Sequence, residues 1–137
     1  MARSTENPFL LIPPTDTEAI AKYVDTRFDP WWRRKEASWR VNNIRCNRRL
    51  YVALLAFFEG RCGICGVHWT VLGRLHAADH SHTTGEVRGI LCGRDNYELG
   101  RCEVMEGLGV KTRLSRAQRG YLARCKRFRE TTGNPLA

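Results

Sequence analysis

One stretch of this sequence, residues 60–100, constrains the fold more than any other. It holds three of the six cysteines and all four histidines of the chain. It opens with the Cys-x-x-Cys pair of Cys62 and Cys65, and near its end Cys92 is followed three residues later by Asp95. A Gly-rich segment in a chain of 137 residues gains limited stability from a hydrophobic core, and a bound metal can supply the rest. We therefore expect this stretch to fold around a metal site.

The three cysteines have the spacing of structural zinc ligands, two in one tight turn and the third about a pair of strands later. Structural zinc takes four ligands, and a carboxylate oxygen is one that it accepts. Asp95 stands where a second Cys-x-x-Cys would end, so it is the first candidate for the fourth ligand, followed by His68 and then Cys102. Ordinary buried thiols are the alternative interpretation. The predicted ligands of a structural Zn²⁺ are Cys62, Cys65, Cys92 and Asp95.

A polar Asp-His-Ser-His run begins at Asp79, between the predicted zinc ligands. A hard divalent cation such as Mg²⁺ prefers oxygen ligands, and Asp79 and Asn96 offer a carboxylate and an amide oxygen. His80 could take the proton from an attacking water near pH 7, and His82 could donate to a phosphate oxygen. Arg88 could contact the same phosphate or brace its strand. Alone, such a run indicates a polar loop or a second zinc site, but its position favours metal-assisted phosphodiester hydrolysis.

The net charge of the chain is +9, with 23 lysines and arginines against 14 acidic residues. An excess of this size indicates an acidic partner, nucleic acid first and an anionic membrane surface second. No apolar run approaches membrane-spanning length, and the first residues lack the apolar region of a signal peptide. We therefore expect a cytoplasmic protein with no membrane partner. In a reducing compartment, cysteines at ligand spacing are expected to bind metal rather than to form disulfides.

The segments on either side of the central stretch are predicted to be helical and basic. One helix is expected over about 16–27, and a second from Asp29 to about residue 58 with a break near 41–43. The last helix is expected to begin at Ser115, which has capping-box spacing to Gln118. Tryptophans alternate with basic residues near position 31, and they could lie in the core while the arginines reach phosphate. The arginines predicted to contact nucleic acid are Arg45, Arg48, Arg49, Arg88, Arg116 and Arg119.

The central stretch is predicted to form two strands and a short helix. The strands are expected at 68–76 and 86–91, with residues 79–82 in the loop between them, and the helix is expected to run from Cys92 to about Gly100. The fold class is therefore α+β and mostly helical. The predicted division is an extended or mobile tail at 1–14, a helical segment at 15–58, a zinc-braced core at 59–107 and a basic C-terminal helix at 108–137.

These motifs resemble the recombination endonuclease VII family of phages and their relatives, within the ββα-metal (His-Me finger, HNH-like) nucleases. The likeness rests on Cys62-Gly-Ile-Cys65 and on a nearly gapless run that begins at Asp79: Asp-His-Ser-His-Thr-Thr-Gly-Glu-Val-Arg-Gly-Ile-Leu-Cys-Gly-Arg-Asp-Asn-Tyr-Glu-Leu-Gly. Neither the N-terminal segment nor the last helix shows a recognisable match. The resemblance therefore concerns the central stretch alone.

The resemblance implies a ββα finger with a structural zinc and a separate catalytic Mg²⁺ or Mn²⁺. It assigns Asp79 and Asn96 to the catalytic cation, His80 to the general base and His82 to a supporting role at the phosphate. The implied activity is endonucleolytic cleavage of DNA, in branched substrates such as four-way junctions. Symmetric cutting of a junction would favour a homodimer. The apolar stripe of the last helix, residues 114–128, could supply that interface or pack on its own core.

The sequence departs from the family pattern at three positions. Asp95 replaces the last zinc cysteine, Ala77 stands where some members have a further histidine, and Leu99 stands where some have a glutamate. The metal and base residues are retained, so the substrate preference is the property left open. The alternatives are a general HNH nicking or restriction-like nuclease and a zinc-dependent DNA-binding protein without cleavage. RNA as the substrate is a further alternative.

Overall fold

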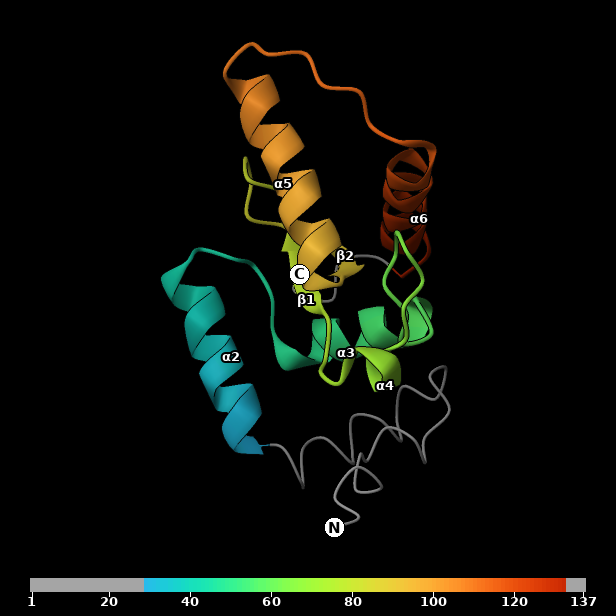
Figure 1. The fold of residues 1–137 in the computed structure, drawn as a ribbon. Helices are drawn as coiled ribbons and strands as arrows, with labels where there is room; N and C mark the ends of the chain where they lie inside the picture. Colours follow the sequence, from blue (N-terminus) through green and yellow to red (C-terminus); the bar gives the residue numbers. More distant parts are fainter. Residues whose placement is uncertain (1–28, 133–137) are drawn as a thin grey trace.

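The computed structural model describes residues 29–132 as an α+β fold that is mostly helical (Figure 1). The tail predicted at 1–14 and the helix predicted over about 16–27 lie outside these residues. No helix in the described range combines the length and the apolar character needed to cross a membrane. The elements are α2 (Asp29–Val41), α3 (Arg48–Phe57), α4 (Trp69–Leu72), β1 (Ala77–His80), β2 (Val87–Leu91), α5 (Gly93–Gly107) and α6 (Arg116–Thr132).

The break predicted near 41–43 separates α2 from α3. Asn43 has a left-handed backbone (φ 57°), which ends α2, and Asn47 then caps α3 by accepting the Leu50 N–H over 2.8 Å. Glu36 on α2 accepts a hydrogen bond from the backbone N–H of Arg48 and ties the two helices together. Cys46 was expected within a helix, but it lies in this connection and is half-buried.

The strand predicted over 68–76 is wrong. The chain there forms α4, because the backbone N–H of Leu72 and of Gly73 find acceptors one turn earlier, at His68 and Trp69. Burial of Trp69 against the core holds this turn in place, and tertiary packing therefore overrides the strand preference of the sequence. The first strand begins only at Ala77, so Asp79 and His80 lie on β1 rather than in a loop.

The two strands form an antiparallel hairpin in which Asp79 pairs with Gly89, with an irregularity in register between Asp79 and His80. The turn is defined by two backbone hydrogen bonds between Ser81 and the residues Gly85 and Glu86. Gly85 has φ 76°, and a side chain there would meet the carbonyl oxygen of Asn43. The strand predicted at 86–91 is confirmed as β2, and the hairpin places the Asp-His pair directly before the turn.

The helix after Cys92 is longer than predicted. It was expected to stop near Gly100, but α5 continues to Gly107. Gly100 does not end the helix, because Leu99 is fully buried and the Gly100 Cα lies against the His82 imidazole, where an added Cβ would be 3.1 Å from the ring. Packing of α5 on both strands thus outweighs the low helix propensity of glycine. The extension adds Glu103 to the neighbourhood of the hairpin.

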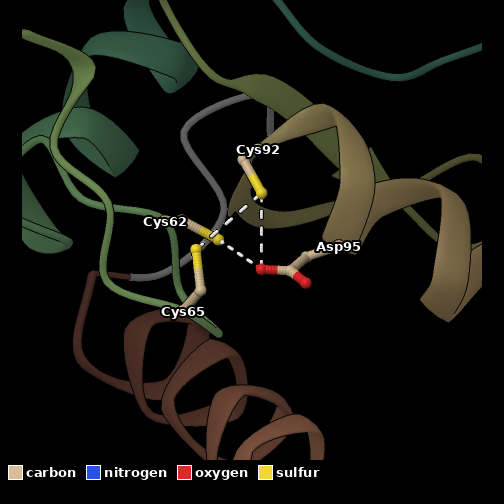
Figure 2. Close-up of side chains that lie close together, drawn as sticks. All are labelled: Cys62, Cys65, Cys92 and Asp95. Atoms are coloured by element: carbon tan, nitrogen blue, oxygen red, sulfur yellow. Dashed lines mark hydrogen bonds between the residues drawn. The ribbon is translucent and has the colours of Figure 1, made fainter. Parts of the chain in front are cut away.

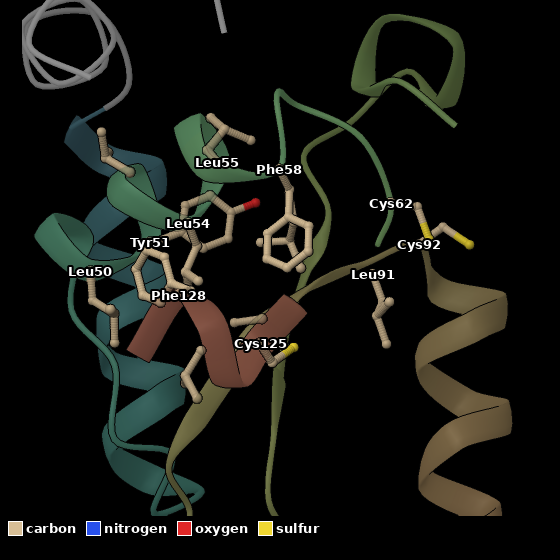
Figure 3. Packing of buried hydrophobic residues seen from close by; sticks show 14 of the residues in the cluster. Leu50, Tyr51, Leu54, Leu55, Phe58, Cys62, Leu91, Cys92, Cys125 and Phe128 are labelled. Carbon is tan, nitrogen blue, oxygen red and sulfur yellow. The ribbon is translucent and has the colours of Figure 1, made fainter. Parts of the chain in front are cut away.

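The hydrophobic core lies between α2, α3, the hairpin and α6 (Figure 3). Trp32 and Trp39 are buried there and pack edge-on or tilted against Tyr51, so these tryptophans belong to the core. The chain turns back after α5 so that α6 returns toward α3 and β2 (Figure 1). The buried face of α6 consists of Tyr121, Cys125 and Phe128. These three residues of the predicted apolar stripe pack on the core of the chain itself.

The capping box predicted for the last helix is confirmed. The Ser115 hydroxyl oxygen accepts the Gln118 backbone N–H over 3.0 Å, and the Gln118 side-chain oxygen accepts the Ser115 N–H over 2.7 Å. These two bonds satisfy N–H groups that the first turn of α6 leaves without helical partners. They define where α6 begins and therefore which of its residues face the hairpin.

Candidate active site

Three thiols and one carboxylate converge where the turn after α3 meets the start of α5 (Figure 2). Their ligand atoms all lie within 4.8 Å of one another. Asp95 Oδ2 is 3.2 Å from Cys62 Sγ and 3.3 Å from Cys92 Sγ, and Cys65 Sγ is 3.9 Å from Cys92 Sγ. A tetrahedral zinc with bonds of about 2.3 Å would place its ligand atoms roughly 3.5–3.8 Å apart. The group therefore fits a zinc ion in both spacing and donor chemistry.

Local backbone structure positions each of these four residues. Cys62 and Cys65 stand in a tight turn closed by the Gly66 N–H to the Cys62 carbonyl, and the Cys62 N–H is bound by the Val67 carbonyl. Cys92 is the N-cap residue of α5, and Asp95 lies in the first turn of that helix. The two halves of the group therefore come from segments far apart in the sequence, and the Gly63 N–H donates to the Ile90 carbonyl of β2 and joins the cysteine turn to the hairpin.

The structure brings Asp95, rather than either alternative, to the three thiols. The His68 ring instead lies 5.0 Å from the Trp69 ring, and Cys102 lies about two turns beyond Asp95 along α5. Every cysteine in the described range is free of disulfides.

Burial and the short contacts among the four side chains shift the pKa values of Cys92 and Asp95 in opposite directions. Burial raises the pKa of the Cys92 thiol to about 12. Burial also acts to raise the pKa of Asp95, but hydrogen bonds from the three thiols outweigh it and lower the net value. Asp95 is therefore ionised, and its other oxygen lies 3.4 Å from the Arg94 guanidinium. A bound zinc would displace the thiol protons, as metal thiolate sites do.

Replacing Asp95 with cysteine is expected to tighten zinc binding by about tenfold or more, because thiolate is a softer and stronger zinc ligand than carboxylate. Competition with a chromophoric chelator measures the change. Asp95→Asn is the matched control, since it keeps the shape and removes the charge, and it is expected to weaken binding. Equal zinc affinity for all three proteins would show that position 95 is not a ligand.

The second group is centred on Asp79, which is 3 % exposed and accepts three hydrogen bonds. Arg88 on the neighbouring strand donates Nε to Oδ2 over 3.1 Å and Nη2 to Oδ1 over 3.0 Å. The Tyr121 hydroxyl of α6 donates to Oδ2 over 2.6 Å. Burial and the Asp79 charge both raise the pKa of Tyr121 well above its usual value, so the hydroxyl keeps its proton.

Arg88 joins Asp79 to Glu103 on α5. Its Nη1 lies 2.5 Å from Glu103 Oε2, and the same carboxylate lies 3.8 Å from His82 Nδ1. Burial acts to lower the pKa of Arg88, but the two carboxylates outweigh it and raise the net value, so the guanidinium stays charged. One arginine between two carboxylates leaves a net charge of about −1 before His82 is counted, which suits the neighbourhood of a cation.

The two histidines of the Asp-His-Ser-His run lie side by side, with ring centroids 5.1 Å apart. His80 is half-buried, and its Nδ1 is a buried atom without a hydrogen-bond partner within residues 29–132. His82 is exposed and lies over Gly100 of α5. Asn96 is half-buried in the first turn of α5, next to Asp95. The residues of the described range therefore leave this nitrogen free to bind a further group.

Two residues of this network were not predicted from the sequence. Glu103 was missed because the helix was expected to end near Gly100, three residues earlier. Tyr121 was assigned to the apolar stripe of the last helix. The signal for Tyr121 was its hydroxyl, because a tyrosine on a buried face almost always has a hydrogen-bond partner.

The arginines predicted to contact nucleic acid fall into two kinds of surroundings. Arg88 and Arg48 are partly buried and ion-paired, the latter with Glu36 over 3.4 Å, and both brace the fold. Arg45 is exposed, and its backbone N–H binds the Gly85 carbonyl beside the hairpin turn. The remaining exposed members are Arg49 on α3 and Arg116 and Arg119 on α6.

Comparison with known families agrees with the motifs. The family model for recombination endonuclease VII matches residues 36–131, a range that includes both groups of side chains and the buried face of α6. The likeness therefore extends beyond the central stretch to α3 and α6, where the motifs alone predicted no match. Searches of curated proteins and of solved structures gave no match. The family match spans more than half of the chain, and this protein therefore belongs to the recombination endonuclease VII family, a family of endonucleases.

Proposed function

We propose that this protein is a metal-dependent endodeoxyribonuclease that hydrolyses phosphodiester bonds in branched DNA, such as four-way junctions. The observation that carries the proposal is the family match over residues 36–131. That range includes the Asp79–His80 pair at the end of β1 and the cysteine group at the start of α5. The order β1, β2, α5 supports a ββα finger of the His-Me type, with the cysteine group holding a structural zinc.

Asp79 and Asn96 are proposed to hold a catalytic Mg²⁺ or Mn²⁺. Their chemistry fits, because a hard cation prefers carboxylate and amide oxygens. Asp79 Oδ1 accepts one hydrogen bond, so an acceptor position on that oxygen remains for a ligand. When bound, such a cation neutralises charge on the scissile phosphate and on the leaving oxygen. Arg88 donates to the Asp79 carboxylate and holds it in place, and Glu103 in turn binds the Arg88 guanidinium.

His80 is proposed to act as the general base. Its imidazole lies at the end of β1 beside Asp79, and its Nδ1 has no partner within the described range. A neutral imidazole can accept the proton of an attacking water as its oxygen bonds to phosphorus. If the bond between phosphorus and the 3′ oxygen breaks, the products have 5′-phosphate and 3′-hydroxyl ends. His82, exposed and 5.1 Å from the His80 ring, is placed to contact a phosphate oxygen.

The DNA is proposed to follow the exposed basic side chains near the hairpin turn and along α6. Between residues 111 and 129 the chain has eight basic residues and no acidic one. Phosphate contacts of this kind give affinity without sequence preference and weaken as salt is added. Because the buried face of α6 serves its own core, a homodimer that cuts both strands of a junction would need another surface.

The proposal is tested by cleavage of a labelled four-way junction and of a linear duplex with the same sequences, with Mg²⁺ or Mn²⁺ and with chelator. We expect cation-dependent cutting of the junction and much slower cutting of the duplex. Equal cutting of both would support a general HNH nuclease and contradict the junction preference. Binding without any cutting by zinc-loaded protein would support a DNA-binding protein instead.

A further inference from the structure

The hydroxyl of Tyr121 on α6 reaches the carboxylate of Asp79 on β1 next to Gly89 of β2. The two groups are 2.6 Å apart, and the residues are 42 positions apart in the sequence. Tyr121 is fully buried, and Asp79 is 3 % exposed. A helix outside the hairpin therefore contacts a side chain to which the proposed function assigns the catalytic cation.

This contact can form because the two positions next to the Tyr121 side chain are glycines. Gly89 is the cross-strand partner of Asp79, and a Cβ there would lie 2.7 Å from the Tyr121 hydroxyl. A Cβ at Gly63, in the cysteine turn, would lie 2.2 Å from the Tyr121 ring. Arg124, one turn further along α6, also donates to the Gly63 carbonyl. The ring is therefore confined between β2 and the cysteine turn.

The hydrogen bonds of Asp79 leave a specific part of the carboxylate free. Oδ2 accepts from Tyr121 and from Arg88 Nε, so both of its acceptor positions are used. Oδ1 accepts only from Arg88 Nη2 among these donors, so one position remains on that oxygen. Arg88 alone would leave Oδ2 with a free position as well. The Tyr121 hydroxyl is thus the group that distinguishes the two oxygens.

We infer that Tyr121 is a positioning residue, which with Arg88 fixes the Asp79 carboxylate so that Oδ1 is the oxygen offered to the divalent cation. The inference rests on the proposed function, because that function assigns Asp79 to the cation. Partners that orient a ligating carboxylate typically contribute about 10–100-fold to metal affinity or activity. Tyr121 would contribute in this way without touching the substrate.

The test is Mn²⁺ binding by calorimetry to zinc-loaded protein without DNA. Tyr121→Phe removes the hydroxyl and keeps the packed ring, and it is expected to weaken Mn²⁺ binding by about tenfold or more. The matched control is Tyr51→Phe, because the Tyr51 hydroxyl is equally buried and donates over the same 2.6 Å, but to the backbone carbonyl of His76. This control is expected to lower stability and leave Mn²⁺ affinity unchanged.

Two further variants separate failure of the inference from failure of the proposed function. Asp79→Asn is expected to abolish Mn²⁺ binding, and Gly89→Ala is expected to reproduce the effect of Tyr121→Phe by displacing the hydroxyl. If Asp79→Asn abolishes binding while Tyr121→Phe matches the wild type, the positioning role is overturned and the cation site stands. Equal losses in the two tyrosine variants would also overturn it. If the wild type has no Asp79-dependent Mn²⁺ site, the proposed function and the inference fail together.

Discussion

Replacing His80 with alanine is expected to lower the rate of DNA cleavage by about 10²–10⁴-fold, the usual contribution of a general base. His80 lies at the end of β1 beside the buried Asp79, and the Nδ1 of its imidazole has no partner within residues 29–132. Alanine offers no group that could accept a proton from water. The proposed phosphate contacts lie on other side chains, so DNA affinity is expected to stay nearly unchanged. Single-turnover cleavage at saturating enzyme measures the rate, and gel-shift binding without divalent cation measures the affinity.

The control for this experiment is Thr83→Ala in the same turn. Thr83 is exposed, and it binds the Ser81 hydroxyl through its backbone N–H, which alanine retains. Cleavage by this variant is expected to match the wild type. A second variant, His82→Ala, removes the neighbouring ring. A wild-type rate for His80→Ala together with a large loss for His82→Ala would identify His82 as the general base and contradict the assignment of His80 to that role.

Removing zinc from the proposed site at the cysteine group is expected to abolish the cooperative unfolding transition of the chain. In small zinc-binding peptides the metal contributes about 10–16 kcal/mol, whereas whole domains are stable by only about 5–15 kcal/mol. Cys62 and Cys92 are buried within the hydrophobic core, and Asp95 is 9 % exposed. Without a metal, this group would keep an ionised carboxylate against thiols at the junction of the hairpin and α5. Cys62→Ser, or chelation of the wild type, is therefore expected to have this effect in thermal melts followed by circular dichroism.

The matched control for the zinc prediction is Cys102→Ser. Cys102 is half-buried on α5 and lies outside the group of converging ligands. The serine variant therefore replaces a sulfur with an oxygen, as Cys62→Ser does, but removes no candidate ligand. Its melting temperature and zinc content are expected to stay close to those of the wild type. A wild type whose melt does not change with chelator, or one zinc per chain retained in Cys62→Ser, would show that these thiols do not hold the metal.

Features encoded within a few residues could be predicted from the sequence. The capping box at Ser115 and the break near Asn43 depend on neighbouring side chains and on backbone conformation, and both appear where they were predicted. The hairpin strand at 86–91 follows a turn that contains glycine. The four candidate zinc ligands were predicted as a set, because their spacing along the chain already implies a turn, a strand pair and the start of a helix.

Only the tertiary structure determined α4, the length of α5 and the partners of Asp79. The segment over 68–76 has the composition of a strand, but burial of Trp69 and local backbone hydrogen bonds make part of it a helix. The α5 helix continues past Gly100 because Leu99 packs in the core, and this extension brings Glu103 to Arg88.

The Tyr121–Asp79 contact shows most clearly why the sequence alone was insufficient. Helical periodicity predicts which face of α6 is buried, and that prediction is confirmed. Periodicity does not predict that the buried hydroxyl meets a carboxylate 42 residues away. That contact depends on the packing of α6 on β2 and on the absence of a side chain at Gly89. The sequence thus determined the residues available for chemistry, whereas packing between distant segments determined which of them meet.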